Sequence, residues 1–248
     1  MKRGCGAAGP LDPACSARIP FAQLQFGGLK IAAGKPATGR VVDASGSWAA
    51  GPPQAQTFST TIEQTLPKLM ASYNLNVANV GLKLFGGYNT YEEKVTATQQ
   101  SYDIDSMVYG LTASAGFGPL TVKAMIWGGE NTVEYGAGAP AFAAYFNSTT
   151  NQIEDSSILV YGLDLAYKVS DMVSVAAGYQ TGESESDRTG TWEDETDTYF
   201  LNATITLAKG VTLTPEYAVV DLGDKIQNGV KSEETETTWI GVYWQINF

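Results

Sequence analysis

The sequence ends Thr235-Glu-Thr-Thr-Trp-Ile-Gly-Val-Tyr-Trp-Gln-Ile-Asn-Phe248. Taken in steps of two, this run divides into two faces. One face is Thr238, Ile240, Val242, Trp244, Ile246 and Phe248, and the other is Thr237, Trp239, Gly241, Tyr243, Gln245 and Asn247. A period of two predicts a β-strand, because successive side chains of a strand point to opposite faces of its sheet. Aromatic residues near the end of the apolar face are typical of a strand that meets the headgroup region of a membrane.

The same alternation repeats along the rest of the chain, from Phe21 onward. The runs are joined by short turns and long links in strict alternation. The short turns are Gly27-Gly28, Ala78-Asn79, Gly118-Pro119, Ser170-Asp171 and Lys209-Gly210, and the long links are 34–61, 92–105, 134–157, 182–197 and 221–234. Transmembrane barrels have short periplasmic turns and long external loops. We therefore predict an all-β fold, an antiparallel transmembrane β-barrel built as a meander of about eleven strands.

The distribution of side-chain sizes also favours a membrane barrel over a soluble sheet. One face of nearly every run is broad, apolar and rich in tyrosine, as at Leu163, Leu165 and Tyr167. The opposite face carries mainly Gly, Ser, Thr, Asn and Gln. In a β-sandwich the large apolar residues meet inside and the polar ones face water. The polar face lacks the bulk to fill an interior, so we expect the apolar face to meet lipid.

Composition narrows the possible functions of these 248 residues. The chain is 44% hydrophobic, yet it has no run approaching the roughly 18 apolar residues of a transmembrane helix. Its mean hydropathy is −0.11, as a barrel with alternating faces would give. A net charge of −11 argues against nucleic-acid binding, which needs clustered Lys and Arg. With no histidine, a Ser-His catalytic arrangement is impossible, and we expect neither catalysis nor a cofactor.

The first eighteen residues look foreign to the rest of the chain. Segment 1–18 begins with basic residues, but Gly, Pro and Asp interrupt the apolar core that a signal peptide needs. Its cysteines, Cys5 and Cys15, are the only two, and with no histidine they leave a metal site incomplete. We predict a disordered segment over 1–18 and a partial transmembrane barrel over 19–248.

Three motifs resemble the C-terminal part of a Gram-negative general porin, over roughly residues 20 to 248. Leu29-Lys-Ile-Ala-Ala-Gly-Lys35 resembles a porin strand entering a loop, Thr65-Leu-Pro-Lys-Leu-Met-Ala-Ser-Tyr73 the strand after an external loop, and Val242-Tyr-Trp-Gln-Ile-Asn-Phe248 the terminal strand. The resemblance implies a bacterial outer-membrane location, a homotrimer, and a water-filled channel for small hydrophilic solutes. It also implies that the barrel-assembly machinery recognises the last strand through Tyr243, Trp244, Ile246 and Phe248.

The strand count departs from that family. Bacterial single-chain barrels have even strand numbers and both termini on the periplasmic side. About eleven strands ending at Phe248 in the periplasm would place the strand at Phe21 descending from outside. We therefore predict that the chain is the C-terminal piece of a barrel of about sixteen strands.

Charged residues suggest how such a channel would treat solutes. Acids crowd the links 182–197 and 221–234. We predict as pore-lining Lys68, Lys83, Lys123, Asp164, Lys168 and Glu216. One interpretation is that the loop acids are merely solvated and that several of the lysines only mark the periplasmic rim. The other hypothesis is that the acids form a channel mouth that concentrates cations, above a lumen wall that attracts anions. The link 134–157 is expected to be external, with an inward fold as the alternative.

Two other functions stay open. A non-channel outer-membrane barrel, such as an adhesin or an assembly scaffold, would share the alternating strands and the apolar outer face. A water-soluble all-β binding protein would share the strands but would stay monodisperse without detergent. Bilayer conductance separates the first of these from a porin, because a plugged barrel gives no current steps.

Overall fold

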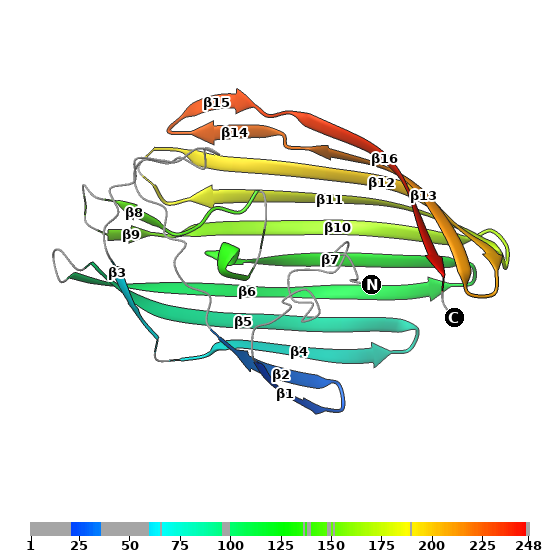
Figure 1. Cartoon of the computed structure of the whole chain (residues 1–248), viewed down its shortest axis with the longest axis horizontal. Coiled ribbons are helices and arrows are strands. Elements are labelled where there is room, and N and C mark those ends of the chain that lie inside the picture. Colours follow the sequence, from blue (N-terminus) through cyan, green and yellow to red (C-terminus); the bar gives the residue numbers. More distant parts are fainter. Residues whose placement is uncertain are drawn as a thin grey trace.

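Antiparallel strands make up almost all of the described structure (Figure 1). The computed structural model describes residues 21–35, 60–64, 66–95, 100–135, 137, 140–147, 150, 152–188 and 190–246. The predicted disordered segment 1–18, most of the link 34–61, and Phe248 lie outside these residues. Within the described residues, no helix is long and apolar enough to cross a membrane.

Eleven strands follow one another across a single sheet in chain order. They are β1 (Phe21–Phe26), β2 (Leu29–Gly34), β4 (Lys68–Val77), β5 (Val80–Val95), β6 (Gln100–Phe117), β7 (Leu120–Glu130), β10 (Ser156–Lys168), β11 (Val173–Ser186), β12 (Trp192–Ala208), β13 (Val211–Asp221) and β16 (Glu236–Ile246). Every neighbouring pair is antiparallel. The predicted all-β meander of about eleven strands is confirmed.

The remaining elements attach to this meander or lie beside it. The sheet gains β3 (Thr60–Glu63), which pairs with β5, and the hairpin of β14 (Asp224–Gln227) and β15 (Val230–Glu233), whose first strand pairs with β12. Along the chain, β7 and β10 are connected through a short 3-10 helix η1 (Thr132–Tyr135) and a separate two-stranded sheet of β8 (Tyr145–Asn147) and β9 (Gln152–Glu154).

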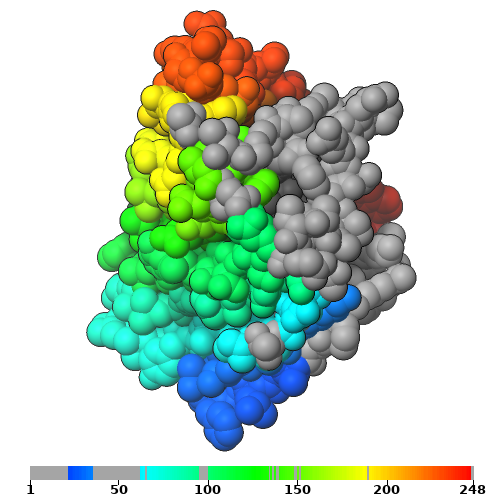
Figure 2. All heavy atoms as spheres, turned by 90° about the vertical axis from the view of Figure 1, so that its left-hand side faces the viewer, coloured from blue at the N-terminus to red at the C-terminus, as the bar shows by residue number. Residues whose placement is uncertain are grey.

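The sheet is curved and open. Figure 2 shows it as an arc that runs from the blue N-terminal strands to the orange hairpin of β14 and β15. In the described part of the chain, β1 and β16 form its two edges and do not pair with each other. Each edge strand therefore presents backbone donors and acceptors on one side.

All five predicted short turns lie at one end of the sheet, which we call the short-turn end. Gly118 and Gly210 take positive φ values of 61° and 79° there, a conformation that glycine adopts without steric cost. Strand β16 finishes at the same end, because Ile246 pairs with Val211, next to the turn at Lys209-Gly210. The opposite end, reached by the long connections, is the long-loop end.

Two of the segments predicted to be long loops are largely strands in the structure, so the prediction is wrong for them. Strands β5 and β6 stay paired as far as Val95 opposite Gln100, across the link expected at 92–105. Strands β11 and β12 stay paired as far as Glu185 opposite Glu193, across the link expected at 182–197. Both extensions carry charged residues on their outer face, as at Glu92 and Glu183, so they lack the apolar alternation by which a strand is read from sequence. The link 221–234 likewise contains the hairpin β14–β15.

The connection between β7 and β10 folds onto the sheet instead of away from it, so the expectation of an external loop is wrong. We call the described residues between 131 and 155 the inner segment, and the face of the sheet that they touch the inner face. Tyr135 of this segment joins a buried cluster with Val108, Trp127, Ile158 and Val160 of the sheet. Each such buried apolar side chain contributes about 1.5–3 kcal/mol through its removal from water. These contacts account for the inward fold.

A second cluster fixes the part of the inner segment that lies nearer the long-loop end. Ala144 packs with Tyr91 and Ile104, and Ile153 flanks them. The rings of Tyr102 and Phe146 meet edge to face, with centroids 5.0 Å apart, an arrangement that aromatic pairs favour. The inner segment thus packs along β5, β6 and β10.

Candidate functional site: the inner face of the sheet

The outer face of the sheet is apolar and exposed. Its side chains are those of the predicted lipid face; Leu163, at the middle of β10, is 46% exposed. Others that are exposed include Tyr73, Leu84, Tyr109, Leu159, Tyr161, Leu165, Tyr167, Leu201, Tyr217, Ile240, Val242 and Trp244. A soluble monomer rarely exposes an apolar patch that continues over so many strands. The polar side chains of these strands therefore lie mainly on the inner face.

Asn131 fixes the point where the inner segment leaves β7. This side chain is 1% exposed, and its amide group donates hydrogen bonds to Asp105 O at 2.8 Å and Asp155 Oδ1 at 2.7 Å. Its Oδ1 accepts from the backbone N–H of Ser156 at 3.1 Å. The residue also has a φ of 49°, which asparagine tolerates better than most residues. One side chain thus ties the start of the segment to its end.

Tyr135 carries the segment across the sheet to β4 and β5. Its ring lies over Gly87, where an added Cβ would come within 2.7 Å of the ring, so the absence of a side chain makes room for it. The Lys68 ammonium sits 3.9 Å from the ring centroid, within cation–π range. The Tyr135 hydroxyl donates to Leu69 O at 3.4 Å. Burial raises the pKa of this phenol, so it stays neutral and remains a donor.

Arg188 clamps the other side of the inner segment. Its guanidinium lies among three aromatic rings, at 4.4 Å from Tyr145, 4.8 Å from Trp192 and 5.7 Å from Phe142. Tyr145 and Phe142 belong to the inner segment, whereas Trp192 begins β12. Arg188 is 8% exposed, and this burial lowers its pKa from the usual arginine value. A desolvated cation over ring faces gains about 2 kcal/mol or more from each good contact.

Hydrogen bonds to the backbone of the inner segment also hold it against the sheet. The Ser184 hydroxyl of β11 donates to Pro140 O, and the Ser156 hydroxyl donates to Phe142 O at 2.7 Å. Within the inner segment, the Asn147 amide donates to Glu154 Oε1 at 2.6 Å across the β8–β9 hairpin. The segment is therefore held at both ends and along its length.

Lys225 links the β14–β15 hairpin to this region. Its ammonium lies 3.0 Å from Asp194 Oδ2 and 3.5 Å from Glu234 Oε1. Burial lowers the pKa of Lys225, but the hydrogen bond and charge of Asp194 outweigh it and the pKa is raised overall. Burial raises the pKa of Asp194 despite its lysine partner. The ammonium also lies 5.9 Å from the Phe142 ring centroid.

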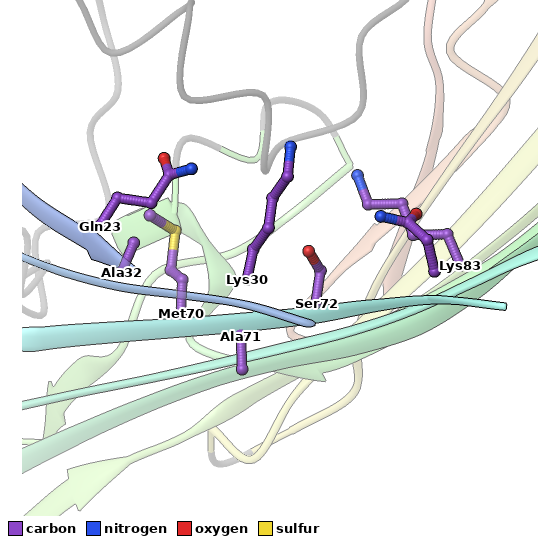
Figure 3. A pocket seen from close by; sticks show the side chains of 8 residues that line it. Gln23, Lys30, Ala32, Met70, Ala71, Ser72 and Lys83 are labelled. Carbon is purple, nitrogen blue, oxygen red and sulfur yellow. The ribbon is translucent and has the colours of Figure 1, made fainter. Parts of the chain in front are cut away.

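The predicted pore-lining residues all belong to strands whose alternation places them on the inner face, but at different depths. Lys68 contacts Tyr135 at the edge of the inner segment. Lys123 and Asp164 are paired directly across β7 and β10. Lys83 lines a cavity with residues of β1, β2 and β4 (Figure 3).

The other two predicted residues have local partners. Lys168 lies at the short-turn end, where its ammonium is 2.6 Å from Asp171 Oδ1, so it marks the rim. Glu216 accepts a hydrogen bond at 3.1 Å from the Asn202 amide of the neighbouring strand. The predicted assembly residues Tyr243, Trp244 and Ile246 lie exposed on β16.

Sequence reasoning missed Asn131, Tyr135 and Arg188, which position the inner segment. Nothing in their spacing marks them, because their partners are up to 66 residues away, as in the Tyr135–Leu69 hydrogen bond. Arg188 stood within a stretch interpreted as an acidic loop. In the described ranges, no group of three or more His, Cys, Asp or Glu side chains is placed to hold a metal ion.

Comparison with known proteins shows the fold. No protein-family model matches the chain. No curated protein matches it. Among solved structures, the outer membrane channel DcaP of Acinetobacter baumannii superposes with a TM-score of 0.59 at 15% identity, over 90% of this chain and 61% of that one. A loop L8 deletion mutant of OmpT, an outer membrane protein of Vibrio cholerae, superposes with a TM-score of 0.51 at 14% identity, over 91% of this chain and 61% of that one.

These similarities agree with the alternation of faces. The chain has the antiparallel meander of outer-membrane β-barrel proteins, and it spans about three fifths of the length of the two structures, 61% in each case. At such low identity the likeness concerns the fold and not the site.

Proposed function

We propose that this chain forms a large part of the wall of a bacterial outer-membrane channel of the porin type. The single observation that carries the proposal is the position of the inner segment. It packs against the inner face by apolar and aromatic contacts, while the outer face keeps exposed apolar side chains on strand after strand. A segment folded into a barrel narrows the passage without removing the polar wall beside it.

The wall on the short-turn side of the inner segment supports a water-filled passage. Its inner positions carry small polar side chains, such as Ser72, Asn74, Thr112, Ser114 and Thr206. Side chains of this size do not fill a barrel interior, and in porins a polar interior encloses water. Small hydrophilic solutes and ions are the cargo that such a passage admits by passive diffusion.

Closure of the wall requires strands beside β1 and β16. Both edges are unpaired within the described residues, and an open edge in lipid leaves backbone groups unsatisfied. We propose that the eleven strands are the C-terminal portion of a barrel of about sixteen. A homotrimer, recognition of β16 by the barrel-assembly machinery and the absence of catalysis complete the proposal, on the strength of the resemblance to general porins.

Planar-bilayer recording tests the proposal with the complete barrel, the eleven strands together with those that we propose beside β1 and β16, extracted from expressing membranes. The channel account predicts discrete ohmic current steps. Arg188→Ala removes the cation from its three rings, so the inner segment loosens and the steps become larger or noisier. Lys231→Gln is the matched control, since its exposed ion pair with Asp224 on the β14–β15 hairpin lies away from the segment.

The opposite results are equally defined. A complete barrel that inserts into the bilayer but gives no steps, with or without Arg188, is a non-channel barrel. Equal conductance in wild type and Arg188→Ala would mean that the inner segment does not set the passage.

A further inference from the structure

A cavity of about 190 Å³ opens on the inner face, at the short-turn end of β1, β2, β4 and β5. Its lining combines the polar side chains of Gln23, Lys30, Ser72, Asn74 and Lys83 with the apolar side chains of Ala32, Met70 and Ala71. Figure 3 shows the Lys30 and Lys83 side chains on the same side of the sheet, with Lys83 extending toward Lys30. The cavity adjoins the region that the inner segment covers, because Met70 also packs against the buried cluster of Tyr135.

The register of the sheet explains why these groups meet. Lys30 is paired with Ser72 across β2 and β4, and Lys83 is paired with Asn74 across β4 and β5. The two lysines therefore flank β4 at positions two residues apart along it, on one face. Neighbouring strands are about 4.8 Å apart, so two flexible lysine side chains can reach one small ligand between them.

These two lysines differ from the other lysines whose contacts the structure describes. Lys168, Lys225 and Lys231 each form an ion pair with a carboxylate. Lys123 has a carboxylate residue, Asp164, directly opposite it in the register of β7 and β10, and Lys68 lies over the Tyr135 ring. Across the described ranges, neither Lys30 nor Lys83 lies within ion-pair distance of a carboxylate.

Their remaining cross-strand neighbours are neutral. Gln25 is opposite Lys30 on β1, and Thr112 is opposite Lys83 on β6. The two ammonium groups, the Asn74 amide and the Ser72 hydroxyl form a set of hydrogen-bond donors on the wall of one cavity. Charge-assisted hydrogen bonds to carboxylate or phosphate oxygens are the interactions that such donors favour.

We propose that Lys30 and Lys83, with Ser72 and Asn74, form a binding subsite for a small oxyanion, a carboxylate or phosphate group, on the inner wall at the short-turn end. Its role in passage rests on the proposed channel function. It places the anion-attracting part of the wall below the inner segment, on the side where a solute leaves toward the short turns. Asp164 and Glu216, on β10 and β13, lie on strands away from it.

The test measures binding and does not depend on conduction. The lysines of the full chain in detergent are converted to ¹³C-dimethyl-lysine, which keeps their charge, and the resonances of Lys30 and Lys83 are assigned from Lys30→Gln and Lys83→Gln. Inorganic phosphate and acetate are titrated separately at constant ionic strength. Lys209, in the exposed turn between β12 and β13, is the reference lysine, and Lys209→Gln is the matched control variant.

The subsite predicts saturable shifts of both resonances with one shared Kd for at least one of the two anions. Lys30→Gln should weaken the binding seen at Lys83 about threefold to tenfold, because it deletes one charge-assisted hydrogen bond in a solvated cavity. Lys209→Gln should leave it unchanged. If neither anion shifts Lys30 and Lys83 more than Lys209, or if Lys30→Gln leaves the Lys83 titration unaltered, the subsite does not exist.

The result is separable from that for the channel. Current steps without these shifts would keep the channel and remove the subsite. Saturable shifts without current steps would keep the subsite, on the inner wall of a barrel that does not conduct.

Discussion

The two ends of the sheet are built on different principles. Toward the short-turn end each strand has an apolar outer side and a small, polar inner side, and turns such as Gly118-Pro119 join the strands directly. Toward the long-loop end the outer side is charged, as at Glu185 opposite Glu193, and the inner side includes buried apolar residues such as Ile104. There the inner face is covered by the inner segment, held by Asn131 and Arg188.

The difference teaches what specifies a strand in each region. Near the short turns the two faces meet different solvents, so alternating hydrophobicity specifies register. Beyond the apolar belt both faces meet water or protein, and the pairing is specified by the hydrogen-bond ladder and by side-chain contacts. Substitutions of the same kind should therefore have unequal effects at the two ends.

The largest expected effect is at Gly129, near the long-loop end of β7. A Cβ added there would lie 2.0 Å from Met107 O, a backbone atom that cannot move away without displacing β6. We expect Gly129→Ala to cost about 3 kcal/mol or more of unfolding free energy, as overpacking against backbone does. Urea unfolding of the refolded chain in detergent measures it.

Gly116 supplies the matched control. It lies on β6, on the same face of the sheet as Gly129, but at the short-turn end. An added Cβ meets nothing within 4 Å there, so Gly116→Ala should change the unfolding free energy by less than about 0.5 kcal/mol. Equal losses in the two variants would contradict the contrast between the two ends.

The second effect concerns the outer face. Leu163→Arg places a charge at the middle of the apolar belt on β10, and we expect it to cost about 2–4 kcal/mol in a bilayer. Glu183→Arg puts the same residue on the same face of neighbouring β11, above the belt and opposite Glu195, and should be neutral or slightly stabilising. Unfolding titrations in lipid vesicles compare the two; a tolerated Leu163→Arg would mean that this face does not meet lipid.

The third effect concerns the hydrogen bonds by which Asn131 joins the two ends of the inner segment. Asn131→Ala removes the hydrogen bonds to Asp105, Asp155 and Ser156 from a buried site, and we expect a loss of about 2–3 kcal/mol. Asn79→Ala, in a short turn, removes one exposed hydrogen bond to Gly116 O and should cost about 0.5 kcal/mol or less. Hydrogen exchange should rise across the inner segment in the first variant alone. Unchanged exchange there would show that other contacts hold the segment.

The smallest effect is electrostatic. Glu185 and Glu193 face each other directly across β11 and β12, and like charges in this arrangement repel. Glu185→Gln should stabilise the chain by a few tenths of a kcal/mol at low salt, and the gain should fade as salt screens it. Thermal unfolding at two ionic strengths checks the sign. A gain that does not depend on salt would point to a cause other than charge.

Much of the fold was predictable because strands with an apolar outer face and a polar inner face show a clear alternation in the sequence. The period of two in runs such as 159–169 revealed the strands and assigned Lys123 and Asp164 to the same face, where the structure pairs them across β7 and β10. Glycine and asparagine in the short turns located the hairpins. The strand number followed from counting these signals.

What stayed hidden depends on contacts between distant residues. The strand extensions near Glu92 and Glu185 carry charges on their outer face and resemble loops in composition, yet each pairs with its neighbour in unbroken register. The inward fold of the inner segment depends on Tyr135 meeting Gly87 and on rings closing around Arg188. No local sequence pattern predicts such contacts, because the residues around each partner along the chain give no sign of them.

The central claim is that the outer face meets lipid while the inner face meets water, except where the inner segment covers it. Spin labels placed one at a time from Val160 to Ala166 on β10 test it directly, in a bilayer and in a chain whose Cys5 and Cys15 are replaced by serine. We predict access to oxygen at 161, 163 and 165, access to a polar nickel reagent at 162, 164 and 166, and shielding from both at 160, where Val160 is 2% exposed. Uniform access along β10, or nickel access at 160 equal to that at 164, would contradict the account.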